Sequence, residues 1–328
     1  MDIQSPSFIK TIEWDMMDKK KFFPLSMLSS FSVRCCFYPL TLIKTQLQVQ
    51  FKNDVYAGMF DCARKIYKSE GSRGLYKGFW ISSMQIFSGV FYISTYEGVR
   101  HLLTQYGAGD RTKSLLAGGC ASLVGQTIIV PFDVISQHAM VLGMGGIGAS
   151  TSKNGSKSLV TELNPLGIVY HKNRSRMKIS IDIASAILRK DGFRGYYRGY
   201  TASLMSYVPN SALWWTFYHL YQDNLISILP SSSSHLLIQC VAGSMGGFTT
   251  TIITNPLDII RARLQVQRLE SINLAFRELW TEEKLHMFFK GLSARLVQSA
   301  AFSFSIILGY ETIKRISIND QYKHLVKW

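Results

Sequence analysis

Three short segments of the sequence carry a proline followed, at fixed distances, by residues that could form ion pairs. Residues 38–44 (YPLTLIK) recur as residues 130–136 (VPFDVIS) and as residues 255–261 (NPLDIIR). The second position after the proline is acidic in two copies, and the fifth position is basic in two copies. A proline inside a helix removes one hydrogen bond and kinks the helix. Three such helices could therefore converge and bring these charges together in a set of breakable ion pairs.

A second chemical signal is one arginine inside an otherwise uncharged stretch. Arg34 is the only Asp, Glu, Lys or Arg in residues 22–43. A charge at membrane depth is expensive and by default indicates a functional site, and a planar guanidinium suits a carboxylate. Arg34 could thus anchor a substrate carboxylate. The alternative is a structural arginine that donates to helix carbonyls.

The elements that must position these residues are long stretches without charge. Five segments contain no Asp, Glu, Lys or Arg: 79–96, 114–132, 199–218, 231–257 and 296–310. Together with residues 22–43 they predict six membrane-spanning helices, because roughly 17–25 mostly apolar residues can cross a bilayer. Their many Ser, Thr, Gly and Gln residues fit helices around a wet interior. Six buried helices of a large soluble α-protein remain the alternative.

The overall composition supports this interpretation and excludes other classes of protein. Only 17% of the 328 residues are charged and 47% are hydrophobic, with a net charge of +15. Soluble chains usually carry about 25% charged residues, and disordered chains are less apolar. The nearly charge-free segments disfavour a nucleic-acid binder. The histidines are dispersed and no CxxC spacing occurs, so we expect no metal site. The sequence has no nucleotide-binding or hydrolase motif, so we expect no cofactor and no catalytic activity.

A glycine motif shows that the chain is built from repeats. Residues 70–78 (EGSRGLYKG) match residues 191–199 (DGFRGYYRG), and residues 283–291 (EKLHMFFKG) form a degenerate third copy. The spacing of both motifs is uneven because about 30 residues are inserted within 142–172, a stretch rich in Gly, Ser and Lys. We predict three repeats of two helices each. Their expected bounds are residues 1–108, 109–228 and 229–328.

The ordered copies of both motifs resemble the mitochondrial carrier family, whose pattern is P-x-[DE]-x-x-[KR]-x-[KR], then [DE]-G and aromatic-[KR]-G. The resemblance covers nearly the whole chain. It implies an all-α membrane protein with six transmembrane helices in three pseudo-symmetric two-helix repeats. It also implies short matrix helices, which we place near residues 57–68, 180–190 and 271–283. The protein would lie in the mitochondrial inner membrane, with both termini facing the intermembrane space.

Three further segments resemble one branch of that family, the branch assigned to branched-chain amino acid import. They are residues 133–138 (DVISQH), residues 207–215 (YVPNSALWW), and Glu13-Trp14 followed by residues 18–22 (DKKKF).

The resemblance assigns roles to the charged positions of the proline motif. Asp133 is expected to pair with Arg261, and Asp258 with Lys44, across the matrix end of the bundle. These pairs would form a matrix gate that must break in each transport cycle.

The third position of this gate lacks charges. Thr41 and Ser136 replace both members of the ion pair, so a hydroxyl contact is the most that we expect there. Gln48 and Gln265 occupy the sites at which the family places bracing glutamines, whereas Met140 occupies the third site and cannot brace a pair.

A second network would close the cytoplasmic side. By analogy with the family, Glu97 would pair with Lys314, and Glu311 could accept a hydrogen bond from Gln222. The middle copy of this motif lacks the ionic residues, so we expect a weaker cytoplasmic gate. Solvated helix ends are the alternative.

On the even-numbered helices, the family's substrate contact positions hold uncharged residues in this chain. With Asn210 added from the 207–215 segment, the predicted substrate-binding residues are Arg34, Gln85, Ser206, Tyr207, Asn210, Gln298 and Ser299. One cation with neutral polar walls fits a small monocarboxylate or a zwitterionic amino acid. Tyr207 and the tryptophans of residues 207–215 could supply an apolar wall or a cation–π contact.

The sequence therefore predicts an inner-membrane carrier that imports branched-chain amino acids by alternating access. Alternatives are a carrier of another neutral amino acid or of a monocarboxylate, and a carrier-fold protein that leaks protons or acts as a scaffold. We expect a monomer that binds membrane lipid, with cardiolipin at the aromatic-[KR]-Gly elements, and no nucleic-acid partner. The first 20 residues are partly acidic and lack an apolar run, so no signal peptide or cleaved presequence is expected.

Overall fold

A computed structural model describes residues 17–50, 55–107, 110–144, 164–168, 174–230, 235–269 and 271–319. These residues are almost entirely helical, and they contain one isolated antiparallel bridge, Met17 with Ile318, and no strand. The all-α prediction is confirmed. Most of the predicted 142–172 insertion and the pair Glu13-Trp14 lie outside the described residues.

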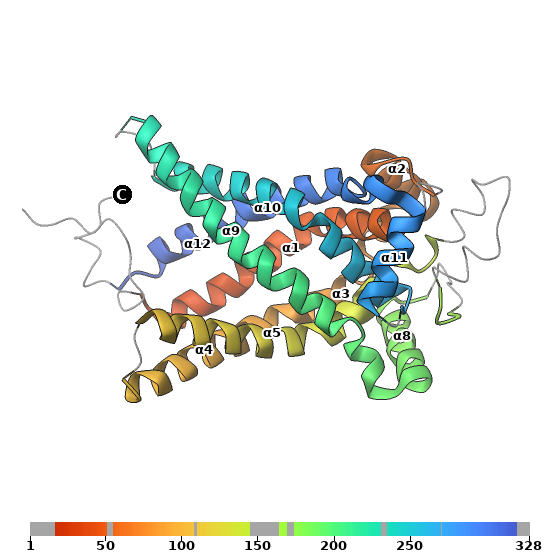
Figure 1. The fold of residues 1–328 in the computed structure, drawn as a ribbon, viewed down its shortest axis with the longest axis horizontal. Helices are drawn as coiled ribbons and strands as arrows, with labels where there is room; N and C mark the ends of the chain where they lie inside the picture. Colours follow the sequence, from red (N-terminus) through yellow and green to blue (C-terminus); the bar gives the residue numbers. More distant parts are fainter. Residues whose placement is uncertain are drawn as a thin grey trace, which may run out of the picture.

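Long helices run along the molecule and short ones cross one end (Figure 1). The long helices are α1 (Lys19–Val49), α4 (Ser88–Gln105), α5 (Asp110–Val141), α9 (Tyr200–Ile228), α10 (His235–Val266) and α12 (Leu292–Ile316). The shorter helices are α2 (Met59–Glu70), α3 (Phe79–Ser83), which leads through a 3₁₀ turn into α4, α8 (Arg176–Asp191) and α11 (Ile272–Glu283). Helices α2, α8 and α11 gather at one end of the bundle and overlap the three segments predicted for matrix helices.

Length and apolar composition alone single out three of the described helical segments as able to cross a membrane. These are Leu116–Val141, Leu236–Val266 and Lys284–Ile316. At 1.5 Å per residue, α1 with its 31 residues is about 45 Å long, which also exceeds the hydrocarbon thickness of a bilayer. Its more polar composition reflects the Lys, Ser, Thr and Gln residues that the sequence already shows.

The three motif prolines all lie inside helices, as predicted. Pro39 is in α1, Pro131 is in α5 and Pro256 is in α10. The acidic and basic positions that follow them are therefore on the same helices, one helical turn apart.

The buried apolar core lies at the end that carries the short helices. Ile66 of α2 belongs to a buried cluster with residues of α1, Ile183 of α8 to one with Val134 of α5, and Leu279 of α11 to one with Ile259 of α10. Each short helix is thus fastened to the proline-containing helix of its own repeat by burial of apolar surface.

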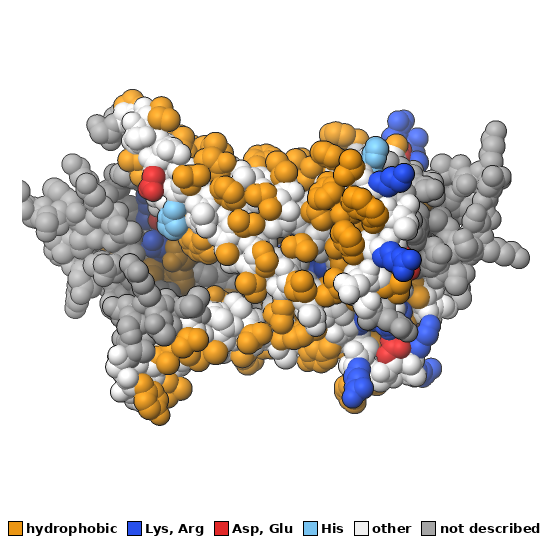
Figure 2. Space-filling view, viewed as in Figure 1, with side chains coloured by type: hydrophobic (Ala, Val, Ile, Leu, Met, Phe, Trp, Pro, Cys, Tyr) orange, Lys and Arg blue, Asp and Glu red, His pale blue; other side chains and the backbone are white. Residues whose placement is uncertain are grey.

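Apolar and charged side chains occupy different parts of the outer surface. Figure 2 shows hydrophobic side chains across the middle of the molecule, and Lys and Arg side chains gathered toward the end with α2, α8 and α11. An apolar middle with basic residues at one end fits a bundle in contact with lipid.

The two ends of the described chain are joined to each other. The Asp18 amide donates to the Ser317 carbonyl at 2.7 Å, next to the Met17–Ile318 bridge. Phe22 and Ile313 pack beside this bridge in a small buried cluster. This junction connects α1 to α12 without a covalent loop, at the end opposite α2, α8 and α11.

Candidate functional site

The predicted binding residues line two adjoining cavities in the bundle, of about 180 Å³ and 250 Å³. Arg34, Gln85 and Gln298 line the first cavity. The second is lined by Ser206, Tyr207, Asn210, Gln298 and Ser299. The structure thus places all seven predicted substrate residues around one continuous region, although they come from α1, α9, α12 and the turn between α3 and α4.

Both predicted ion pairs of the matrix gate are formed. Arg261 of α10 pairs with Asp133 of α5 through its Nη2 atom. The Lys44 Nζ atom of α1 lies 2.5 Å from Asp258 Oδ2 of α10. All four side chains line the cavities, so these pairs form their floor, and this end of the bundle is closed.

One of the two predicted bracing glutamines contacts an ion pair. Gln48 Nε2 donates to Asp258 Oδ2 at 3.2 Å, whereas Gln265 Nε2 donates to Ser203 Oγ at 3.2 Å and to neither gate carboxylate. Gln137, which the sequence interpretation missed, donates to Asp133 Oδ2 at 3.0 Å. Its position four residues after Asp133, on the same helical face, is the signal that could have found it.

The uncharged third position of the gate does not form the expected hydroxyl contact. Thr41 Oγ1 accepts a hydrogen bond of 2.8 Å from Gln298 Nε2, and Ser136 Oγ is 3.4 Å from the carbonyl oxygen of Gly78, to which it donates. Thr41 therefore connects α1 to α12 rather than to α5. This contact joins a predicted gate position directly to a predicted substrate residue.

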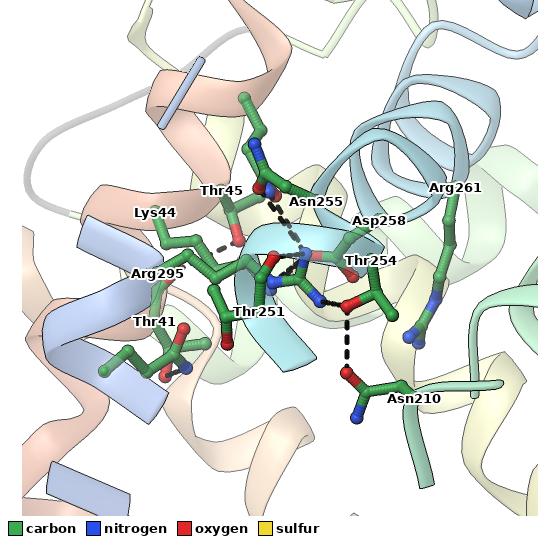
Figure 3. Close-up of polar contacts among 12 residues, drawn as sticks. Thr41, Lys44, Thr45, Asn210, Thr251, Thr254, Asn255, Asp258, Arg261 and Arg295 are labelled. Carbon is green, nitrogen blue, oxygen red and sulfur yellow. Dashed lines mark hydrogen bonds and ion pairs between the residues drawn. The ribbon is translucent and has the colours of Figure 1, made fainter. Parts of the chain in front are cut away.

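A buried cation that the sequence interpretation missed, Arg295, also lines the second cavity (Figure 3). Arg295 of α12 has its Nε atom 3.4 Å from Asp258 Oδ2, and its Nη2 atom donates to Thr254 Oγ1 at 2.9 Å. Thr254 Oγ1 is also within 3.0 Å of Asn210 Oδ1. Within the six apolar segments of the sequence Arg34 is the only charge, and Arg295 lies just outside the last of these segments. The last uncharged span begins at residue 296, but α12 begins at Leu292, so Arg295 lies inside the helix.

Arg34 donates to a helix carbonyl, as the structural alternative expects, and it also lines the first cavity. Its Nη1 atom donates to the Ser82 carbonyl at 2.8 Å, to Ser82 Oγ at 2.6 Å and to Gln85 Oε1 at 3.4 Å. Its Nε and Nη2 atoms contact no acceptor in the part of the chain that the structure describes. Arg34 is therefore held in place by one nitrogen while its other donors remain available to a ligand in the cavity.

The charges of the side chains around the two cavities do not sum to zero. Four are cationic and two are carboxylates: Arg34, Lys44, Arg261 and Arg295 against Asp133 and Asp258. This surplus of positive charge attracts a solute that carries a carboxylate.

Of the two contacts predicted for the cytoplasmic gate, the described side chains test only the one between Glu311 and Gln222, which is not formed. Lys314 Nζ lies 3.2 Å from Glu311 Oε1 of its own helix and 5.2 Å from the centre of the Tyr310 ring. No hydrogen bond joins Glu311 to Gln222 in the described chain, and the Glu97 side chain lies outside it. The structure thus contains both ion pairs predicted for the matrix side, whereas Lys314 and Glu311 of the predicted cytoplasmic gate pair only with each other, within α12.

The aromatic-[KR]-Gly elements place a left-handed glycine just before α3, α9 and α12. Gly78, Gly199 and Gly291 have φ values of 75°, 74° and 62°. Lys77, which precedes the first of them, lies 2.5 Å from Glu70 Oε1 and donates to the Leu142 carbonyl at 2.9 Å. Burial lowers the pKa of the Lys77 ammonium, and the nearby Glu70 carboxylate opposes that shift. This contact ties the first repeat to the second.

Comparison with known proteins places the chain among solute transporters. The family model described as "Mitochondrial carrier protein" matches residues 22–107, 110–228 and 232–321. The chain is 40% identical over 320 residues to "Solute carrier family 25 member 44" of Mus musculus and of Homo sapiens, covering 98% of each chain. It is 26% identical over 269 residues to "Mitochondrial glutamate carrier 2" of Rattus norvegicus, covering 79% of this chain and 82% of that one. On these matches and on its helical architecture, the protein belongs to the mitochondrial carrier family.

Proposed function

We propose that this carrier imports the branched-chain amino acids leucine, isoleucine and valine across the mitochondrial inner membrane. The observation that carries the proposal is the position of Arg34 in a cavity that ion pairs close at one end. Ser82 and Gln85 hold one nitrogen of Arg34, and its other two nitrogens contact no acceptor among the described residues. A substrate carboxylate would bind these nitrogens through charge-assisted hydrogen bonds.

The remaining walls fit a small solute with an apolar side chain. Gln85, Ser206 and Gln298 offer neutral hydrogen bonds. Phe302, which lines both cavities, and Tyr207 offer apolar surface. The choice of branched-chain amino acids within this class rests on the resemblance of the 133–138 and 207–215 segments to that branch of the family.

Transport would proceed by alternating access. The pairs Asp133–Arg261 and Lys44–Asp258 close the matrix side and must separate before the solute can leave on that side. Because a bound solute can shift an equilibrium only by its difference in affinity for the two states, the substrate must interact more strongly with the intermediate in which these pairs are broken.

A monocarboxylate such as a branched-chain 2-oxo acid is the second candidate. The surplus of cationic side chains around the cavities favours it, since such a solute carries one negative charge and no positive charge. Another neutral amino acid, a proton leak or a scaffold role are further outcomes that a transport assay distinguishes.

Lipid binding forms a separate part of the proposal. The left-handed glycines before α9 and α12 leave helix N-termini whose N–H groups can bind phosphate. We expect cardiolipin, with its two phosphates, to bind there to a monomeric carrier.

Uptake into liposomes tests the proposed cargo. The purified carrier is reconstituted and supplied in turn with labelled leucine, valine, glutamate, alanine and 4-methyl-2-oxopentanoate. We expect the fastest saturable uptake for leucine and valine. Leucine uptake equal to that of protein-free liposomes would contradict the proposed cargo, and uptake of the oxo acid alone would establish the second candidate.

A further inference from the structure

The two carboxylates at the floor of the cavity have different surroundings. Asp133 Oδ2 accepts from Arg261 and from Gln137, so one cation and one amide contact this side chain. Its Oδ1 atom accepts no hydrogen bond from the described residues, and it is not fully buried. With a side chain 17% exposed, Asp133 presents an oxygen to the cavity.

Asp258 is surrounded by more positive charge. Lys44 and Arg295 both approach its Oδ2 atom, at 2.5 Å and 3.4 Å, and Gln48 donates to the same atom. Its Oδ1 atom also takes no donor from the described residues, but a further cation there would meet two positive charges within a few ångströms. Like charges at such distances repel strongly in a partly dehydrated site.

We propose that Asp133 binds the α-ammonium group of the transported amino acid. This inference rests on the proposed function, and it names the residue that distinguishes an amino acid from its 2-oxo acid. Arg34 lines the same cavity as Asp133. A zwitterion can therefore direct its carboxylate to Arg34 and its ammonium to Asp133.

The charges on the protein favour this orientation over the reverse. Arg34 and Asp133 carry opposite charges and line the same cavity. A bound zwitterion inserts its own opposite charges between them, so each protein charge gains a partner. In the reverse orientation of the zwitterion, its ammonium would face Arg34 and its carboxylate would face Asp133, so like charges would meet at both ends.

The same contact couples binding to the gate. Arg261 and the ammonium compete for one carboxylate, so an amino acid on Asp133 weakens the pair between α5 and α10. A 2-oxo acid has the same carboxylate and side chain but a carbonyl in place of the ammonium. It would leave the Asp133–Arg261 pair intact, and it would lose one charge-assisted hydrogen bond.

The ratio of two affinities measured on one variant isolates this contact from general effects on turnover. Unlabelled leucine and unlabelled 4-methyl-2-oxopentanoate each compete with labelled leucine for uptake into liposomes. On the purified protein in detergent, the increase in melting temperature that each compound causes gives a second measure, which does not require transport. The variants are Asp133→Asn, Asp133→Glu and, as the matched control, Asp258→Asn, which removes the same charge from the other gate pair.

The wild type is expected to prefer leucine by roughly tenfold or more, the effect of one hydrogen bond to a charged group. Asp133→Asn should bring the ratio close to one, while Asp133→Glu and Asp258→Asn should keep the wild-type preference. Asp133→Asn with an unchanged ratio, or Asp258→Asn with an equal loss, would overturn the inference. A wild type that transports both compounds equally would overturn it and leave the carrier role intact, whereas a wild type that neither binds nor transports leucine would overturn the proposed cargo as well.

Discussion

The Arg295 guanidinium lies 3.4 Å from the Asp258 carboxylate, which Lys44 also binds at 2.5 Å. One acidic side chain of α10 is therefore held by α12 and by α1 at the same time. Asp258 consequently links three helices of the predicted gate, whereas the gate position formed by Thr41 and Ser136 has no charges.

The first prediction concerns Arg295. Arg295→Gln should lower the stability of the carrier by about 1–3 kcal/mol, because it removes a charged donor from Asp258 and a partner from Thr254. The measurement is the melting temperature of the purified protein in detergent. Arg100→Gln is the control, since Arg100 is exposed near the opposite end of the bundle and should stay within about 0.5 kcal/mol of the wild type. Equal effects of the two variants would contradict the buried role of Arg295.

The second prediction compares charge reversal at the two ion pairs. Asp133→Arg and Arg261→Asp should each destabilise the protein by about 3 kcal/mol, because each leaves a partly buried charge facing a like charge. The double variant should recover at least half of that loss.

At the other pair, the combination of Lys44→Asp with Asp258→Lys should not recover stability. The new ammonium at position 258 would lie beside Arg295, which stays in place. Melting temperatures of the six variants test this difference, and equal recovery in both double variants would show that Arg295 does not act on the gate.

The third prediction concerns the turn before α3. Gly78 has a φ of +75°, and a Cβ atom there would lie 2.8 Å from the Ser136 carbonyl oxygen. Gly78→Ala should cost about 1–2 kcal/mol for the left-handed conformation alone, with the close contact adding to it. Gly89→Ala is the matched control, because no atom lies within 4 Å of its added methyl group, and it should be neutral or stabilising. Thermal unfolding that ranks the two variants in the opposite order would refute this description of the turn.

The fourth prediction concerns the junction of the two chain ends. Phe22 is 4% exposed, and its ring lies 5.9 Å from the Tyr310 ring in an edge-to-face arrangement. Phe22→Ala should destabilise the carrier by about 3 kcal/mol through the cavity that it leaves between α1 and α12. Leu28→Ala, on the same helix but 61% exposed, should change the melting temperature little. A Phe22 variant as stable as the Leu28 variant would mean that the junction contributes nothing to stability.

The sequence was sufficient to predict the gate ion pairs because a repeated motif fixes their positions on three equivalent helices. Asp133, Lys44, Asp258 and Arg261 stand at constant offsets from prolines, and the pseudosymmetry of the family then selects their partners. The same periodicity could have identified Gln137, one helical turn from Asp133.

Other contacts depend on where a helix begins and how two helices face each other. Arg295 lies inside α12 because this helix begins at Leu292, which the absence of charge in residues 296–310 does not reveal. Gln298 reaches Thr41 because α12 packs against α1, and Gln265 turns to Ser203 rather than to the gate. Such contacts depend on side-chain rotamers between helices that are distant in sequence, and a one-dimensional pattern does not contain them.

The most direct test of the central claim measures leucine uptake by liposomes that contain wild-type carrier, Arg34→Gln or Arg34→Lys. Arg34→Gln should lower uptake at least tenfold, because the substrate carboxylate loses a charge-assisted hydrogen bond. Arg34→Lys should retain part of the uptake, since a point charge replaces the planar fork. Melting temperatures confirm that the three proteins are folded, and Lys20→Gln, at an exposed position of the same helix, should transport normally. Near-normal leucine uptake by folded Arg34→Gln would contradict the role of Arg34 in binding the carboxylate.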